Sequence, residues 1–564
     1  MRSDLDRKYD EVLAAVTAPG GRIQIGRDAE GRAIITNLPP TLPLLFDAFS
    51  MLNGAVEAVV AGGERITFAD LNAQATALAK VLAGSWNVAK GDRVAIAMRN
   101  CPAWIVAYMA VLKAGGIATL INGWWQAEEM RHALDLSEPE LIIADDARAK
   151  RLAARGCTIP TVALPVERPL GEALAPLLER HEEAELPEVS AEDDATILFT
   201  SGSTGLAKGA VSTHRAVTTA VYTYAIGLAT LLTIKELEGE TPANPPKTLV
   251  NVPLFHVTGE VPVLLNSFVI GRTMVLMPKW DAGEALRLIE KEKVTYFVGV
   301  PTMSLELMQH PDRDKYDLSS LTDIAAGGAP RPVVHVKRLE ASFKTAQPAL
   351  GYGLTETNAI GSSNFWSNYH DKPASTGRPH KPTVEMAILG EGDRHLPAGQ
   401  RGEVAIRSAA NIRGYWRDEG ATRAAFTADH YLKTGDIGYF DEDGYLFIVD
   451  RKKDIIIRGG ENISAAEVEA AVYAQPDVSE AAVFGVADDR LGEVPVAIVY
   501  SEKGVIDPEA LLAHLAGHIA QFKLPALIRV EREPLPKLGT GKIDKVSLRQ
   551  RFAQESAAAG KGEE

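Results

Sequence analysis

The chain is 564 residues long, more than one ordinary hydrophobic core holds, so we expect two or more domains. Its 46% hydrophobic and 24% charged residues are typical of a globular protein. The formal net charge of −15 argues against nucleic-acid binding, which needs a basic face, but it does not exclude small anionic substrates.

The cysteines and the N-terminus bear on the compartment. Cys101 and Cys157 are too few for a disulfide framework and lack the spacing of metal ligands. The first eight residues are charged and lack the apolar core of a signal peptide. No apolar run reaches the roughly 18 residues that a membrane helix needs. We therefore predict a cytoplasmic protein without a transmembrane segment.

Strands and helices alternate through the first part of the chain, after a mixed segment over residues 1–40. Such alternation predicts parallel sheets covered by helices. The expected strands are 65–68, 92–97, 117–121, 141–144, 194–199, 273–277 and 294–300. The expected helices are 69–82, 102–113, 216–232 and 283–292.

A β-rich region and a small α+β region follow. Residues 385–407 favour a hairpin, and 445–449 a further strand. Beyond a charged run at 450–454 we expect helices 465–474 and 508–522, strands 480–486 and 494–500, and a frayed tail from Gln554. The predicted fold class is α/β, with a large N-terminal domain of helix-covered, mostly parallel sheets plus a β-rich subdomain, and a small α+β C-terminal domain.

A glycine- and hydroxyl-rich loop, residues 200–209, directly follows the apolar strand 194–199. Glycines allow backbone N–H groups to converge on an anion, and Lys208 adds a positive charge. A polyphosphate site is one interpretation, and a Gly/Ser turn or linker is the other. The loop is not a Walker A motif, because Gly209 follows Lys208 where that motif has Ser or Thr.

A second motif spans residues 351–357. Gly351 and Gly353 flank Tyr352, which suits a ligand ring stacked against the backbone. Thr355 and Glu356 offer a hydroxyl and a carboxylate, a common way to hold Mg²⁺ beside substrate phosphates. The alternative is a helix N-terminus with a capping threonine and an acidic first turn.

Four further segments are weak signals when taken singly. His256 is a candidate catalyst or a core histidine, and residues 325–330 are a turn or the edge of a purine site. Asp436, with Arg451, suits the hydroxyls of a ribose, although turn formers also surround it. Lys542, on a glycine-bracketed loop, either reaches an active site or is a solvated surface residue.

Taken in sequence order, these segments resemble the core motifs of the acyl-activating, adenylate-forming superfamily, which includes acyl-CoA synthetases, adenylation domains of peptide synthetases and firefly luciferase. The resemblance spans roughly residues 40 to 550. It implies a two-step reaction: a carboxylate attacks the α-phosphate of MgATP to give acyl-AMP and pyrophosphate, and a thiol, usually coenzyme A, then displaces AMP. The matching motifs are residues 200–209, 253–259, 327–330, 352–356, 434–436, 450–467 and 536–542.

The resemblance also implies a role for each nucleotide-facing motif. Asp436 and Arg451 would hold the ribose, Thr355 the α-phosphate, and Glu356 would be the Mg²⁺ ligand. The residues implied around adenine are Gly328, Ala329, Pro330 and Tyr352. The residues implied to hold the β and γ phosphates are Thr200, Ser201, Gly202, Ser203, Thr204, Gly205 and Lys208.

The remaining motifs are implied to serve the acid, coenzyme A and the movement of the small domain. Lys542 would bridge the carboxylate and the α-phosphate in the first step, and His256 would border the acyl pocket. Lys453 matches the family's hinge position, and Gly460 would line the tunnel for the pantetheine arm of coenzyme A. The implied divisions are an N-terminal domain over 1–450, a hinge over 451–454 and a mobile C-terminal domain over 455–564. A homodimer is the assembly expected for this type of enzyme.

The acid is the open question. The pocket candidates are small, mostly apolar and free of cationic groups, which favours a hydrophobic acid, first a fatty acid, over an amino acid. An aryl or steroid-like acid, an acyl-AMP ligase that loads a carrier protein, and a nucleotide-binding regulator without chemistry are the alternatives. Two prolines common in the family are replaced, by Ala207 and Ala465, and we expect activity to survive both changes. The pocket candidates are Val257, Thr258, Val261, Val300 and Pro301.

Overall fold

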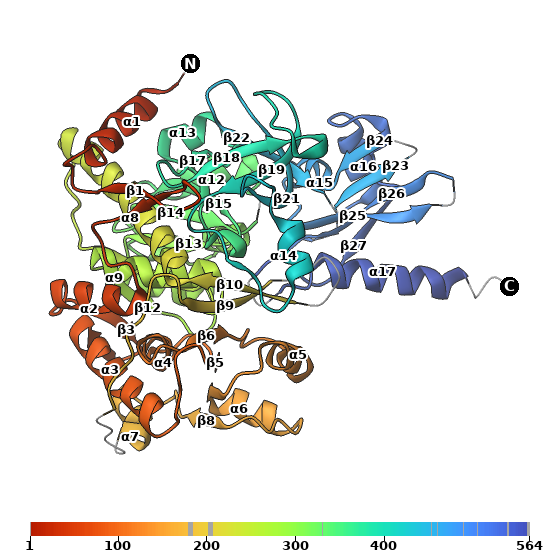
Figure 1. Cartoon of the computed structure of the whole chain (residues 1–564). Helices are drawn as coiled ribbons and strands as arrows, with labels where there is room; N and C mark the ends of the chain where they lie inside the picture. Colours follow the sequence, from red (N-terminus) through yellow and green to blue (C-terminus); the bar gives the residue numbers. More distant parts are fainter. Residues whose placement is uncertain are drawn as a thin grey trace.

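Two large sheets and the helices between them form the body of the protein in this computed structural model (Figure 1). The residues that the structure describes are 2–178, 184–200, 207–329, 331–452, 454–458, 461–488, 490–504, 506–538 and 541–560.

The first sheet has seven strands in the order β20-β10-β9-β6-β5-β7-β8. The strands from β9 to β8 are parallel, and β10 runs antiparallel to β9. Four of these strands had been expected from the alternation. Their bounds are β5 (Arg93–Ala97), β6 (Ile117–Leu120), β7 (Leu141–Asp145), β8 (Thr161–Leu164), β9 (Asp194–Thr200), β10 (Lys208–Thr213) and β20 (Gly414–Tyr415).

The second sheet has nine strands in the order β17-β16-β15-β14-β13-β11-β12-β3-β4. The six strands from β15 to β3 are parallel, as the alternation predicts, and the edge strands are antiparallel. Their bounds are β3 (Glu57–Ala61), β4 (Glu64–Thr67), β11 (Lys247–Val250), β12 (Thr273–Leu276), β13 (Tyr296–Gly299), β14 (Asp323–Gly327), β15 (Gln347–Gly353), β16 (Gly361–Phe365) and β17 (Arg378–Pro379).

Apolar helices fill the space between the two sheets. In α4 every residue after Pro102 is buried, as expected of a helix that is hydrophobic on all sides. The helices of this part are α1 (Asp4–Val16), α2 (Leu42–Leu52), α3 (Phe68–Gly84), α4 (Pro102–Lys113), α5 (Ala127–Ser137), α6 (Asp146–Ala153), α7 (Leu170–Leu178), α8 (His214–Leu237), α9 (Asn266–Ile270), α10 (Ala282–Glu292), α11 (Pro301–Gln309), α12 (Val333–Ser342), α13 (Trp366–Asp371) and α14 (Glu419–Ala425).

The β-rich region is a four-stranded antiparallel sheet, and it contains the expected hairpin over 385–407. Its strands are β18 (Glu385–Leu389), β19 (Gly402–Arg407), β21 (Leu432–Phe440) and β22 (Leu446–Arg451). Short pieces elsewhere are β1 (Ile25–Arg27), β2 (Ala33–Ile35), the π-helix η1 (Gly259–Leu265), and the 3₁₀ turns η2 (Arg313–Lys315), η3 (Thr355–Thr357), η4 (Glu391–Asp393) and η5 (Gln521–Lys523).

The C-terminal segment, blue in Figure 1, has its own sheet and its own core. This confirms the predicted small α+β domain beside a large N-terminal one, whereas the hinge at 451–454 stays a prediction. The elements are β23 (Ile455–Arg458), β24 (Glu461–Ser464), α15 (Ala465–Tyr473), β25 (Glu480–Asp488), β26 (Gly492–Tyr500), α16 (Pro508–Ala516), β27 (Leu527–Glu531) and α17 (Lys545–Gly560).

Three sequence-based expectations were wrong. The tail was expected to fray from Gln554, but residues 554–560 belong to α17, which continues to Gly560 through alanines and other strong helix formers; residues 561–564 lie outside the described residues. The helix expected over 508–522 ends at Ala516, where Gly517 follows. The third concerns apolar runs: the helix α8 is long and apolar enough to cross a membrane. However, 56% of its most apolar 18-residue stretch is buried inside the protein, as in the core helix of a globular protein.

Candidate active site

Four predicted site segments follow the carboxyl ends of neighbouring parallel strands of the nine-stranded sheet. His256 comes after β11, Val300 after β13, Gly328 after β14 and Glu356 after β15. Ligands of open α/β sheets bind outside the carboxyl ends of the strands. Segments that lie up to 100 residues apart in the chain therefore share one edge of the sheet.

Glycines keep the backbone open where β14 and β15 end side by side. Gly327 and Gly351 are register partners, and a side chain built at Gly351 would meet no atom within 4 Å. Gly328 has a φ of +74°, which suits glycine. This pair of strand ends thus offers a flat backbone surface of the kind a planar ring can occupy.

The turn after Tyr352 depends on a glycine for a different reason. A Cβ on Gly353 would lie 2.2 Å from the carbonyl oxygen of Ala359, closer than atoms can approach. The backbone then forms the single 3₁₀ turn η3, which holds Thr355 and Glu356. The helix N-terminus that was the alternative interpretation is thus only a three-residue turn, too short to give the acidic residue a capping role.

Asp436 and Arg451 are register partners on β21 and β22. The Asp436 carboxylate accepts hydrogen bonds from the Tyr352 hydroxyl at 2.7 Å and from Arg451 Nε at 3.1 Å. Burial raises the pKa of Asp436, and Arg451 and Tyr352 oppose that rise. The structure therefore brings three residues from three predicted motifs into direct contact.

Glu356 and Lys208 meet through a residue that sequence reasoning missed, Tyr415. The Tyr415 hydroxyl donates a 2.9 Å hydrogen bond to Glu356 Oε1, and Lys208 Nζ lies 5.1 Å from the centre of the Tyr415 ring. Tyr415 sits on the two-residue strand β20, which pairs with β10. Local sequence carries no signal for such a short edge strand.

Lys542 extends from the small domain to Gly328, near the charges of Arg451 and Asp436. Its Cε and Nζ lie 3.1 and 3.3 Å from the position that a Cβ on Gly328 would take. Burial and the nearby charge of Arg451 lower the pKa of Lys542 to about 8, while Asp436 opposes that shift. Burial, reinforced by Lys542, lowers the pKa of His256 to about 3, so His256 is neutral at physiological pH.

The acyl-pocket candidates are mostly buried. Val257, Val261, Val300 and Pro301 are buried, and Thr258 is half-buried. Gly259, between Thr258 and Val261, has to be a glycine because a Cβ there would lie 2.1 Å from the Pro253 carbonyl oxygen.

Several of the expected site residues lie outside the described residues, and their predicted roles stay predictions. Thr200, which is described, is the register partner of Lys208, so the two residues mark the ends of the predicted phosphate loop. Ala329 is described and follows Gly328 at the end of β14. The residues outside the described ranges are Ser201, Gly202, Ser203, Thr204, Gly205, Pro330, Lys453 and Gly460.

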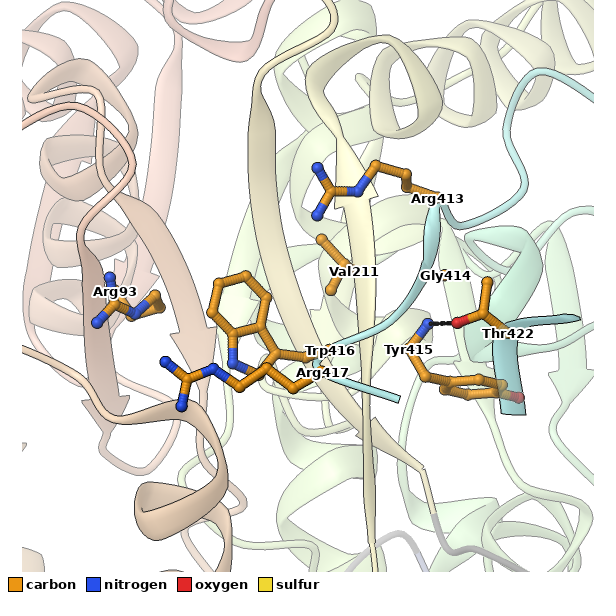
Figure 2. A pocket seen from close by; sticks show the side chains of 8 residues that line it. All are labelled: Arg93, Val211, Arg413, Gly414, Tyr415, Trp416, Arg417 and Thr422. Carbon is orange, nitrogen blue, oxygen red and sulfur yellow. Dashed lines mark hydrogen bonds between the residues drawn. The ribbon is translucent and has the colours of Figure 1, made fainter. Parts of the chain in front are cut away.

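An arginine-rich hollow of about 450 Å³ has Val211 of β10 in its wall (Figure 2). Val211 is three positions from Lys208 on β10, and side chains at successive strand positions point to opposite faces, so these two side chains point to opposite faces of the strand. The guanidinium carbons of Arg93 and Arg417 each lie 5.8 Å from the centre of the Trp416 indole (Figure 2). Among the described residues, none of the predicted site residues lines this hollow.

Oxygen donors at the cluster suit magnesium. Glu356 supplies a carboxylate and Thr355 a hydroxyl, and Mg²⁺ prefers oxygen ligands, keeping several sites for water and substrate phosphates. Over the described ranges, no three His, Cys, Asp or Glu side chains gather into a metal site of their own. Two protein oxygens leave positions for the phosphate oxygens and waters that Mg²⁺ also takes, so Glu356 and Thr355 fit a Mg²⁺ ion bound together with a nucleotide.

Comparisons with known proteins agree with this geometry. A family model described as AMP-binding enzyme matches residues 49–416, and one described as AMP-binding enzyme C-terminal domain matches residues 467–542. The chain is 34% identical over 530 residues to the long-chain-fatty-acid–CoA ligase of Bacillus subtilis, covering 87% of this chain and 90% of the relative. It is 35% identical over 497 residues to a feruloyl-CoA synthase of Amycolatopsis, covering 88% and 96%.

The crystal structure of ATP-bound MatB from Rhodopseudomonas palustris is also similar, with a TM-score of 0.78 and 28% identity over 91% of this chain and 99% of that one. Enzymes of this type use ATP, Mg²⁺ and coenzyme A. The chain belongs to the AMP-binding enzyme family and is an AMP-forming acid–CoA ligase.

Proposed function

We propose that this ligase activates a hydrophobic carboxylic acid, a fatty acid in the first place. The observation that carries the proposal is the chemistry of the pocket candidates: Val257, Val261, Val300 and Pro301 are buried and apolar. A pocket of this kind binds a hydrocarbon chain and offers no partner for a second charged group on the substrate. The long-chain-fatty-acid–CoA ligase of B. subtilis, at 34% identity, supports the same class.

In the proposed first step, an oxygen of the carboxylate attacks the α-phosphorus of ATP. The bond from that phosphorus to the bridging oxygen breaks, and pyrophosphate leaves. Lys542 would hold the carboxylate and the α-phosphate together, and charge neutralisation of this kind is the main contribution to such transfers. Asp436 and Arg451 would orient the ribose, and Glu356 would hold the Mg²⁺, which supplies positive charge to the phosphates.

In the proposed second step, the sulfur of coenzyme A attacks the acyl carbon, and the bond to the AMP oxygen breaks. Lys542 has no part in this step. The small domain would therefore turn about residues 451–454, with Lys453 as the hinge, and bring the strand that carries Gly460 to the site. Such an alternation gives one small domain two successive uses.

A panel of carboxylic acids tests the proposal. Purified enzyme is given MgATP and one acid at a time, and pyrophosphate release and acyl-CoA are measured with and without coenzyme A. The proposal predicts the highest kcat/KM for fatty acids, with a dependence on chain length. Preference for an amino acid or a short dicarboxylate would contradict it.

An aromatic acid is the second candidate, because a feruloyl-CoA synthase is 35% identical to this chain. The same panel separates the two candidates if it includes cinnamate derivatives and a steroid-like acid. Accumulation of acyl-AMP without thioester, in the presence of coenzyme A, would instead indicate a ligase that loads a carrier protein.

A further inference from the structure

The loop that carries Lys542 rests along one helix of the large domain, α11. Gly541 packs against Val300 and Met303: a Cβ added at Gly541 would lie 3.0 Å from Val300 Cγ2 and 3.4 Å from Met303 Cε. The Thr302 hydroxyl donates a 3.4 Å hydrogen bond to the Gly541 carbonyl oxygen. The first turn of α11 thus contacts the residue that precedes Lys542.

One turn further along α11, an ion pair joins the two domains. Lys537 Nζ lies 3.1 Å from Glu306 Oε1, across the domain boundary. Glu306 is fixed from its own side, because its other oxygen accepts a hydrogen bond from the Trp280 indole. Lys537 is fixed from the other side by Glu480 Oε1, at 2.8 Å.

Glu480 is itself held in place. It is buried at the start of β25, and its second oxygen accepts a 2.7 Å hydrogen bond from the Leu535 backbone N–H. Leu535 and Lys537 belong to the same loop, which closes on itself where Leu538 N donates to the Lys542 carbonyl oxygen at 2.7 Å. The pair therefore joins two rigid supports rather than two mobile side chains.

We propose that Glu306 is a positioning residue: by pairing with Lys537 it stabilises the domain orientation in which Lys542 reaches the site, and so favours acyl-AMP formation over thioester formation. This inference rests on the proposed alternation of the small domain. A rotation that carries Lys542 away from Gly328 also carries Lys537 away from Glu306, because both lysines lie on one loop. The pair therefore contributes to only one of the two orientations.

The contribution of the Lys537–Glu306 pair to the domain orientation depends on how far the two side chains are exposed to solvent. The side chains of Lys537 and Glu306 are 27% and 32% exposed, so water screens the pair in part. Measured pairs of this kind correspond to about a two- to fivefold change in an equilibrium constant. The expected shift in orientation is therefore modest but measurable.

The test is the substitution Glu306→Gln, assayed in each half-reaction separately. Glutamine keeps an oxygen that can accept from Trp280 and removes only the charge. Acyl-AMP formation is followed by acid-dependent pyrophosphate release in single turnover, and thioester formation is followed from supplied acyl-AMP and coenzyme A. We expect acyl-AMP formation to fall about two- to fivefold while thioester formation does not fall.

Asp317→Asn is the matched control, because it removes an exposed carboxylate that pairs with Lys293 inside the large domain. It should leave both half-reactions at the wild-type rate. In a Lys537→Gln background, Glu306→Gln should have no further effect, because the pair is already broken.

Equal losses in both half-reactions, no change in either, or an undiminished effect in the Lys537→Gln background would each overturn the proposal. Wild-type enzyme in the same assays separates this result from the proposed function. A wild type that forms no acyl-AMP from any acid refutes the function, whereas an active wild type matched by Glu306→Gln refutes only the positioning role.

Discussion

The charge on Lys542 should make acyl-AMP formation dependent on pH. Burial and Arg451 lower the pKa of this lysine to about 8, from a usual value of 10.5. With a pKa of about 8, about 90% of the amines are charged at pH 7 and about 10% at pH 9. Because only the charged amine can bridge the carboxylate and the α-phosphate, kcat/KM for ATP should fall about tenfold over that interval. The sign is fixed: activity is lost as pH rises through the pKa.

The assay is kcat/KM for ATP in the acyl-AMP half-reaction, because this parameter reports the ionisation of the free enzyme. Two controls isolate Lys542. Lys542→Arg stays charged throughout, so its lower rate should be flat from pH 7 to 9. Thioester formation from supplied acyl-AMP should lack the inflection near pH 8. An inflection that persists in Lys542→Arg, or that also appears in the thioester step, would refute the assignment of the titrating group.

Three other substitutions test separate parts of the structure. Gly328→Ala places a Cβ 3.1 Å from Lys542 Cε at a φ of +74°, so acyl-AMP formation should fall about tenfold. An unchanged single-turnover rate would contradict this contact. Asp436→Asn removes the negative charge that pairs with Arg451 and that would hold the ribose. The KM for ATP in steady-state assays should therefore rise about 10- to 100-fold. A normal KM would rule out a ribose contact. Asp6→Asn, far from the site, removes a buried carboxylate that accepts a 2.9 Å hydrogen bond from Arg378. The free energy of unfolding, measured by denaturant titration, should fall by about 2 kcal/mol while kcat stays unchanged. Equal stability would show that the pair is dispensable.

Much of the fold could be predicted because its elements have strong local signals. The helix expected over 102–113 has the bounds of α4, where a proline at the first position and a wholly apolar sequence define it. Of the four parallel strands β11, β13, β14 and β15, only β13 had been expected, although strand–helix alternation predicted that the sheet would be mostly parallel. Local sequence patterns indicate where strands and helices lie but not which strands pair with each other. The strand order of the sheets is therefore known only from the structure.

The site was less predictable, because its contacts join distant segments. Asp436 and Arg451 were paired from their motifs, yet Tyr352 joins them through a hydrogen bond across 84 residues. Tyr415 escaped prediction altogether, since a tyrosine on a two-residue edge strand has no local pattern that marks it. The segment from Gln554 to Gly560 was misjudged because an Ala-rich sequence suits both a frayed end and a helix, and here it forms the last part of α17.

The central claim is that one ATP molecule lies among the glycine turns, Glu356, Asp436 and Lys542. A crystal structure with a non-hydrolysable acyl-adenylate analogue tests this most directly. We predict the ribose hydroxyls within hydrogen-bonding distance of Asp436, the adenine against Gly328, and the acyl chain beside Val261. Adenosine bound away from these residues, for example in the arginine-rich hollow behind β10, would contradict the account.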